Sequence, residues 1–202
     1  DASLIAYLWP LLIVIFTAVL NGKSLKWFHY LGTLIAFLGT IILVSRGQYH
    51  GFKAEYKIGY LSALICAVIW SSYSVLNGKF GKIPTNVVGC FCIAVTVLSF
   101  ILHLFLEETN LPTDFTEWLA IVALGVLPVG VAFFSWDYGT KYGDIVVLAT
   151  FSYFAPLIST IALVIFSKNQ FSAYIGVACF LIIGGAVLSS KELLKTDPGQ
   201  SS

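Results

Sequence analysis

The chain has 202 residues, is 58% hydrophobic and only 10% charged, and carries a formal net charge of +1. Its mean hydropathy is +0.92, whereas soluble domains are about 45 to 50% apolar and about 25% charged. These values exclude a soluble globular domain, and the near-zero net charge gives no reason to expect a nucleic-acid partner. The expected surroundings are a lipid bilayer.

Seven stretches of the chain contain no Asp, Glu, Lys or Arg, and each is 19 to 24 residues long. A spanning helix needs about 20 residues, and a charge at the bilayer centre is costly. The stretches are too long and too uniformly apolar for barrel strands. We therefore predict an all-α polytopic membrane protein with seven transmembrane helices, at residues 2–22, 27–45, 58–78, 83–106, 118–136, 145–167 and 169–190. The polar residues 191–202 predict a short disordered tail.

The first span holds Pro10 inside the apolar run AYLWPLLIVIF. Proline in a helix interior removes a backbone hydrogen bond and costs roughly 3 kcal/mol, so the break needs a reason. A second copy of the pattern Tyr-x-x-Pro-Leu-aliphatic occurs in the sixth span, where YFAPLI begins at Tyr153, 146 positions after Tyr7. After each copy the chain turns and enters a glycine-marked helix, with Gly32 and Gly39 in the second span and Gly176 and Gly184 in the seventh.

The two copies lie five helices apart, an odd number, so they must cross the membrane in opposite directions. Inverted repeats of this kind build many secondary transporters. Residues 58–190 would hold a complete five-helix repeat, and residues 1–45 the last two helices of the other copy. Three further helices are then expected before residue 1.

Side chains suited to a cavity lie on single faces of two spans. Trp70, Tyr73 and Asn77 are spaced i, i+3 and i+7 in the third span, and Thr150, Tyr153 and Thr160 share a face of the sixth. Aromatic rings with polar tips suit an inward lining, although those near a helix end also suit an interfacial belt.

Three prolines are expected to leave helix carbonyls unpaired. Pro10 would release the carbonyl of Ala6, Pro156 that of Ser152, and Pro128 that of Leu124. Unpaired carbonyls in a membrane are tolerated inside protein or beside a wet cavity, so the matched pair favours a cavity over a simple kink. For Pro128 both interpretations stay open.

Ionisable and metal-binding chemistry is sparse. The four cysteines, all within apolar runs, are interpreted as small buried hydrophobes, and no metal site, cofactor or catalytic residue is predicted. Asp137 follows the fifth span and is expected to pair with Lys141. Because no charged residue lies inside a span, we expect either an uncoupled carrier or a carrier whose ionisable group for coupling lies on the missing helices.

Several stretches together resemble the drug/metabolite transporter superfamily of EamA type, and most closely its aromatic amino acid exporters. They are Tyr7-Leu8-Trp9-Pro10, Ile69-Trp70-Ser71-Ser72-Tyr73 with Asn77 and Lys79, Phe133-Phe134-Ser135-Trp136-Asp137-Tyr138-Gly139, and Ser152-Tyr153-Phe154-Ala155-Pro156. The resemblance covers the whole chain as helices four to ten of a ten-helix transporter with two inverted repeats. It implies an exporter of small organic solutes that works by alternating access through a central cavity.

The residues expected to bind the substrate follow from the spacing argument together with this resemblance. For Tyr7 and Trp9, the resemblance favours substrate binding over a place in an interfacial belt. They are Tyr7, Trp9, Pro10, Trp70, Tyr73, Asn77, Ser152, Tyr153 and Pro156. A neutral, aromatic pocket suits aromatic or other apolar amino acids. The alternatives are a carrier for other metabolites or drugs, a seven-helix receptor, and an intramembrane enzyme. A retinal protein is disfavoured because the seventh span has no lysine for a Schiff base.

Orientation follows from the lysines and arginines of the loops. Seven of them fall on the side of the first loop and four on the other. This predicts residue 1 outside and the C-terminus in the cytoplasm, and the inner membrane of a bacterium is the expected location.

Overall fold

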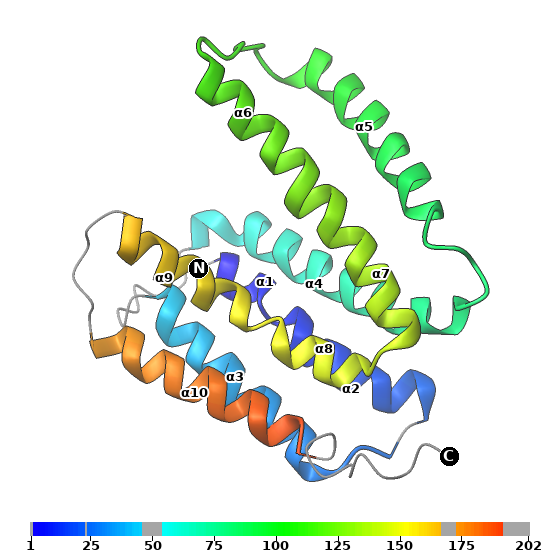
Figure 1. The fold of residues 1–202 in the computed structure, drawn as a ribbon, viewed down its shortest axis with the longest axis vertical. Coiled ribbons are helices and arrows are strands. Elements are labelled where there is room, and N and C mark those ends of the chain that lie inside the picture. The colour runs from blue at the N-terminus through cyan, green and yellow to red at the C-terminus, as the bar shows by residue number, and fades with distance from the viewer. Residues whose placement is uncertain (1, 23, 46–53, 167–172, 192–202) are drawn as a thin grey trace. The chain divides into compact units, whose positions relative to one another are not determined.

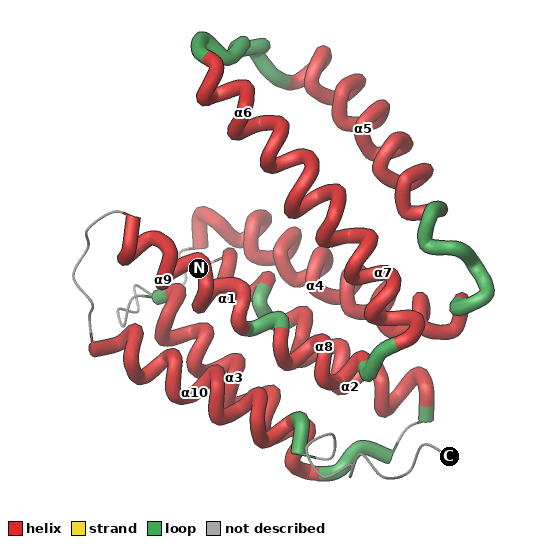
Figure 2. Tube along the Cα trace, in the orientation of Figure 1, coloured by secondary structure: helices red, strands yellow, loops and turns green. Residues whose placement is uncertain are grey.

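A computed structural model describes residues 2–22, 24–45, 54–166 and 173–191, and within these ranges its regular elements are all helical (Figures 1 and 2). In chain order they are α1 (Ala2–Ala6), α2 (Trp9–Asn21), α3 (Trp27–Val44), η1 (Ala54–Tyr56), α4 (Lys57–Asn77), η2 (Gly78–Phe80), α5 (Val87–Leu106), α6 (Phe115–Leu124), η3 (Gly125–Val131), α7 (Ala132–Tyr142), α8 (Ile145–Phe151), α9 (Phe154–Phe166) and α10 (Ala173–Ser189).

The helices correspond to the apolar stretches of the sequence. Six helical stretches of the described residues are long and apolar enough to cross a bilayer, and α10 adds an apolar helix of 17 residues. The prediction of an all-α polytopic membrane protein is therefore confirmed. Residue 1 and residues 192–202 lie outside the described residues, so the predictions for the two ends of the chain are not tested.

The chain forms two compact units. Unit 1 comprises residues 1–76 and 144–202, and unit 2 comprises residues 77–143. In unit 1 the helices α3 and α10 pack closely because glycines face each other. A Cβ atom built on Gly32 would lie 2.5 Å from the backbone nitrogen of Ser189, and one built on Gly185 would lie 2.6 Å from that of Ala36. Only glycine lets these two backbones approach so closely.

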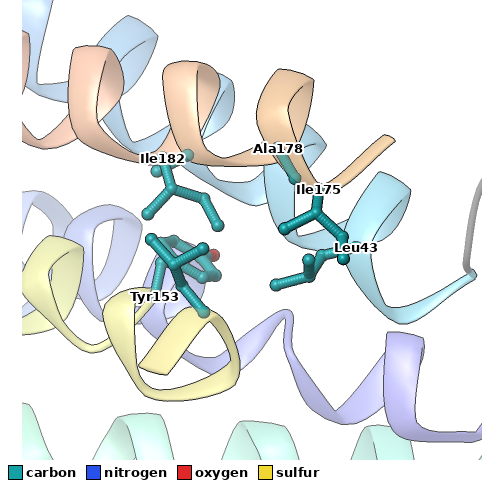
Figure 3. Packing of buried hydrophobic residues seen from close by; sticks show 7 residues of the cluster. Leu43, Tyr153, Ile175, Ala178 and Ile182 are labelled. Carbon is teal, nitrogen blue, oxygen red and sulfur yellow. The ribbon is translucent and has the colours of Figure 1, made fainter. Parts of the chain in front are cut away.

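The core of unit 1 lies where α9 meets this helix pair (Figure 3). Its buried members are Ala36, Leu43, Tyr153, Leu157, Ile175, Ala178 and Ile182. They come from α3, α9, α10 and the turn that precedes α9. The core therefore fixes the helix break around Tyr153 against the two glycine-packed helices.

The first and sixth spans are broken, as their prolines suggested. Turn residues Tyr7 and Leu8 separate α1 from α2, and turn residues Ser152 and Tyr153 separate α8 from α9. Each predicted single span, 2–22 and 145–167, is thus two shorter helices. Each break precedes its proline, because a proline fits the first turn of a helix, where its missing N–H is not needed.

In unit 2 the fifth span is longer than the predicted 118–136, because α6, η3 and α7 join into one helical stretch from Phe115 to Tyr142. Its start is fixed by Asp114, whose side chain accepts a hydrogen bond from the Glu117 backbone N–H at 2.8 Å. Pro128 lies in η3, which is a π-helix. This wider turn lets the helical stretch continue past Pro128, from α6 through η3 into α7.

Candidate functional site

Three aromatic rings of unit 1 form a continuous cluster across α2 and α4. The rings of Trp9 and Trp70 meet edge to face with centroids 6.4 Å apart. Tyr73 lies one turn along α4, its ring 5.6 Å from that of Trp70. All three side chains are half-buried. We call Trp9, Trp70 and Tyr73 the aromatic cluster; it joins residues that are 61 positions apart in the sequence.

Ser71 connects the aromatic cluster to the helix break. Its hydroxyl lies 2.8 Å from the carbonyl oxygen of Trp9 and 2.6 Å from that of Ala67, and both oxygens can accept its proton. The bond to Trp9 ties α4 to the first turn of α2. Sequence reasoning missed this role, because only the proximity of α2 shows that the hydroxyl reaches beyond its own helix.

Tyr153 joins the two helix breaks to each other. Its side chain is fully buried, and its hydroxyl donates a hydrogen bond of 3.2 Å to the carbonyl oxygen of Tyr7. Pro10 and Pro156 are buried as well. In this structure Tyr153 therefore holds the breaks together, and contact of its ring with a substrate stays a prediction.

The carbonyl of Ser152 is not left unpaired, contrary to the prediction made from Pro156. It accepts a hydrogen bond of 3.1 Å from the Ala155 backbone N–H, which tightens the turn. The Ser152 hydroxyl donates to the carbonyl oxygen of Leu148, 2.9 Å away. The carbonyl and the hydroxyl of Ser152 both bond within the chain's own turn, and the proposed role of Ser152 in binding is not tested by these contacts.

Asn77 belongs to unit 2, where it bonds to α7. Its side-chain nitrogen donates to a carboxylate oxygen of Asp137 and to the hydroxyl of Thr140, both at 2.9 Å. The Lys141 ammonium lies 2.7 Å from the other carboxylate oxygen, and the side chains of Asp137 and Lys141 are each only 3% exposed. The predicted Asp137–Lys141 pair is present, but it is buried within the long helical stretch, so that stretch does contain charge.

The four cysteines are free thiols, and no group of His, Cys, Asp or Glu among the described residues is placed to hold a metal ion. Cys66 and Cys90 are exposed on their helices. The prediction that all four cysteines are buried is therefore wrong for these two. An apolar run predicts a membrane helix, but it does not show which face of that helix packs against protein.

The comparisons with known proteins agree with this architecture. The chain is 47% identical, over 94% of its length, to the aromatic amino acid exporter YddG of Ancylobacter novellus, of which it covers 66%. It is 27% identical, over 87% of its length, to YddG of Salmonella typhimurium, of which it covers 62%. A crystal structure of a protein 46% identical in sequence superposes with a TM-score of 0.89, covering 94% of this chain and 67% of that one.

The chain thus spans about two thirds of the length of these relatives. Residues 57–191 match the EamA-like transporter family. This match, together with a relative 47% identical over nearly the whole chain, shows that the chain belongs to the EamA-like transporter family.

Proposed function

We propose that the chain is the larger part of a carrier that exports aromatic or other apolar amino acids by alternating access. The observation that carries the proposal is the aromatic cluster of Trp9, Trp70 and Tyr73, which lies at a helix break. The proposal is also supported by the sequence of the chain, which is 47% identical to a protein named as an aromatic amino acid exporter.

The chemistry of the cluster suits a flat apolar side chain. Aromatic rings pair edge to face or offset, with centroids about 4.5 to 7 Å apart. Half-buried rings still offer surface to a further ring, and the tyrosine hydroxyl can orient a polar end of the solute. Discontinuous helices also place backbone polar groups near the substrate in many transporters.

The remaining sequence predictions belong to the same proposal. Residues 1–45 would be the last two helices of the first repeat and residues 58–190 the complete second repeat. The protein would lie in the inner membrane of a bacterium with residue 1 outside and the C-terminus in the cytoplasm. Its partners would be the bilayer and a small-molecule substrate.

The test is counterflow of tryptophan and phenylalanine by the full-length protein in proteoliposomes. Truncation of Trp70 to Ala removes a ring contact worth about 0.5 to 1.5 kcal/mol beyond its area burial. Transport should therefore fall about tenfold, since about 1.4 kcal/mol corresponds to a factor of ten. Trp70→Phe keeps a flat ring and should retain much of the activity.

Trp118→Ala is the matched control, because Trp118 lies on α6 and its side chain is 50% exposed. This variant should transport normally. Normal transport by correctly inserted Trp70→Ala would show that the aromatic cluster serves packing alone. Failure of the wild-type protein to move either amino acid, while it moves another solute, would identify a carrier of different specificity.

A further inference from the structure

A cluster of three buried hydroxyls joins α8 to the helix pair α3–α10. Thr150 on α8 lies 2.9 Å from the Thr33 hydroxyl of α3 and 3.0 Å from the Ser189 hydroxyl of α10, oxygen to oxygen. Thr33 and Ser189 are 3.5 Å apart, and all three side chains are fully buried. We call Thr33, Thr150 and Ser189 the hydroxyl cluster.

The cluster has more hydrogen-bond contacts than protons. Thr33 also lies 2.8 Å from the carbonyl oxygen of His29, and Thr150 lies 2.9 Å from that of Val146, each one turn back along the same helix. Three hydroxyl protons therefore serve five oxygen–oxygen contacts. When the helices separate, each threonine can keep the bond to its own helix, so separation leaves neither hydroxyl proton unpaired.

The partners of α8 in the cluster are held firmly. Ser189 lies against Gly32, where the backbones of α3 and α10 are in closest approach. The imidazole Nδ1 of His29 donates to the Ser189 carbonyl oxygen at 2.9 Å, which adds a second link between the two helices. The helix α8 has only seven residues, packs against α2 as well as against α3 and α10, and ends at the break formed by Ser152 and Tyr153.

The opposite end of the proposed repeat carries different chemistry. A shift by 146 positions places Cys179, Leu4 and Leu43 where Thr33, Thr150 and Ser189 stand. Leu43 belongs to the apolar core, with Ile175 and Ile182. Hydroxyls can exchange a protein hydrogen-bond partner for water at little cost in free energy, whereas exposure of apolar side chains to water is unfavourable. The α8 end of α3–α10 is therefore better suited to become exposed to water than the opposite end.

We propose that Thr150 is a positioning residue of the transport cycle: the hydroxyl cluster holds α8 on α3–α10 and releases it when that end of the protein opens to water. This proposal rests on the proposed transport function. It assigns the movement to α8, with the break at Ser152 and Tyr153 as its hinge, while α9 stays packed in the core.

A labelling experiment tests the release without reference to any substrate. Thr150→Cys and Thr40→Cys are placed singly in full-length protein that lacks the native cysteines, in proteoliposomes. Thr40 is the matched control, because it is also fully buried and bonds to the Ala36 carbonyl of its own helix. A membrane-impermeant thiol reagent should modify Thr150→Cys at least tenfold faster than Thr40→Cys, and from one side only.

Equal, slow labelling of both cysteines in a protein that transports would overturn the proposal. If the protein moves no aromatic amino acid, the proposed substrate fails, but the labelling rates still decide whether α8 is released. The two proposals therefore fail separately.

Transport kinetics give a second test that remains available if the cysteine variant does not fold. Thr150→Val cannot be hydrated at its side chain after release, so the maximal rate should fall fivefold or more at an unchanged half-saturating concentration. Thr150→Ser should restore the rate to within twofold, and Thr40→Val should leave it within twofold. A maximal rate in Thr150→Val no lower than in Thr40→Val would show that the cluster only packs.

Discussion

At the scale of single residues, the buried charges of unit 2 are the clearest departure from an apolar interior. The side chains of Asp137 and Lys141 are each 3% exposed, and both residues lie inside a stretch long and apolar enough to span a bilayer. Burial of charge is tolerated when the groups are paired and their remaining hydrogen bonds are made. Asn77 and the carbonyl oxygen of Ile83 supply those bonds, at 2.9 and 3.0 Å.

Asp137→Asn should destabilise unit 2 strongly. The substitution leaves the Lys141 ammonium buried without its counter-charge, and removal of one partner of a buried pair costs about 3 to 5 kcal/mol. The expected result is a clearly lower midpoint of thermal unfolding in detergent. Glu108→Gln is the control, because Glu108 is exposed and should melt like the wild type. An unchanged midpoint for Asp137→Asn would show that water reaches Lys141.

At the scale of helices, the sequence predicts positions better than ends or faces. The spans are visible because an unpaired charge is costly in the bilayer, and the two breaks because a proline removes a helix hydrogen bond. The fifth span extends beyond its predicted end because the charges of Asp137 and Lys141 neutralise each other within it. A count of charges along the sequence does not distinguish two charges that pair across one helical turn from the charges of a loop. The partners of Ser71, Tyr153 and Thr150 depend on helix packing, which no local pattern contains.

The glycines of the last helix show the same limit. The sequence pairs Gly184 with Gly39, but a shift of 146 positions places Gly39 on Gly185. In the structure a Cβ atom on Gly185 would contact the Gly32 carbonyl oxygen and the Ala36 nitrogen, whereas one on Gly184 would meet nothing within 4 Å. The glycine that packs against α3 is thus Gly185, the neighbour of the Gly184 that the sequence comparison singled out.

This pair of adjacent glycines gives a sharp test of the α3–α10 contact. Gly185→Ala should separate the two helices, because its methyl group would press on backbone atoms that cannot turn away, and overpacking costs about 1 to 3 kcal/mol. Gly184→Ala should be neutral or slightly stabilising, because alanine favours a helix. The measurement is the thermal unfolding midpoint of both variants in the same detergent; equal midpoints would mean that α3 and α10 are not in close contact.

At the scale of the whole molecule, the proposed inverted repeat can be tested by the number of membrane crossings between two points of the chain. A shift of 146 positions maps the contact between Gly32 and Gly185 onto a contact between Ala178 and Gly39. The structure contains this second contact, because a Cβ atom on Gly39 would lie 3.0 Å from the Ala178 carbonyl oxygen. Likewise the bond from Tyr153 to Tyr7 joins a residue to its own counterpart. Contacts that map onto themselves in this way support two copies related by a pseudo-two-fold axis, as inverted repeats are.

Such repeats require the first and the fourth loops to lie on opposite sides of the membrane, because three spans separate them. Single cysteines at Ser24 and Asn110, both exposed, should therefore react with an impermeant thiol reagent from opposite sides, in protein that lacks the native cysteines. The excess of lysine near the first loop places Asn110 outside. Labelling of both from one side would contradict the odd number of spans and with it the inverted repeat. Labelling of Asn110 from the cytoplasm and Ser24 from outside would keep the repeat and reverse the orientation.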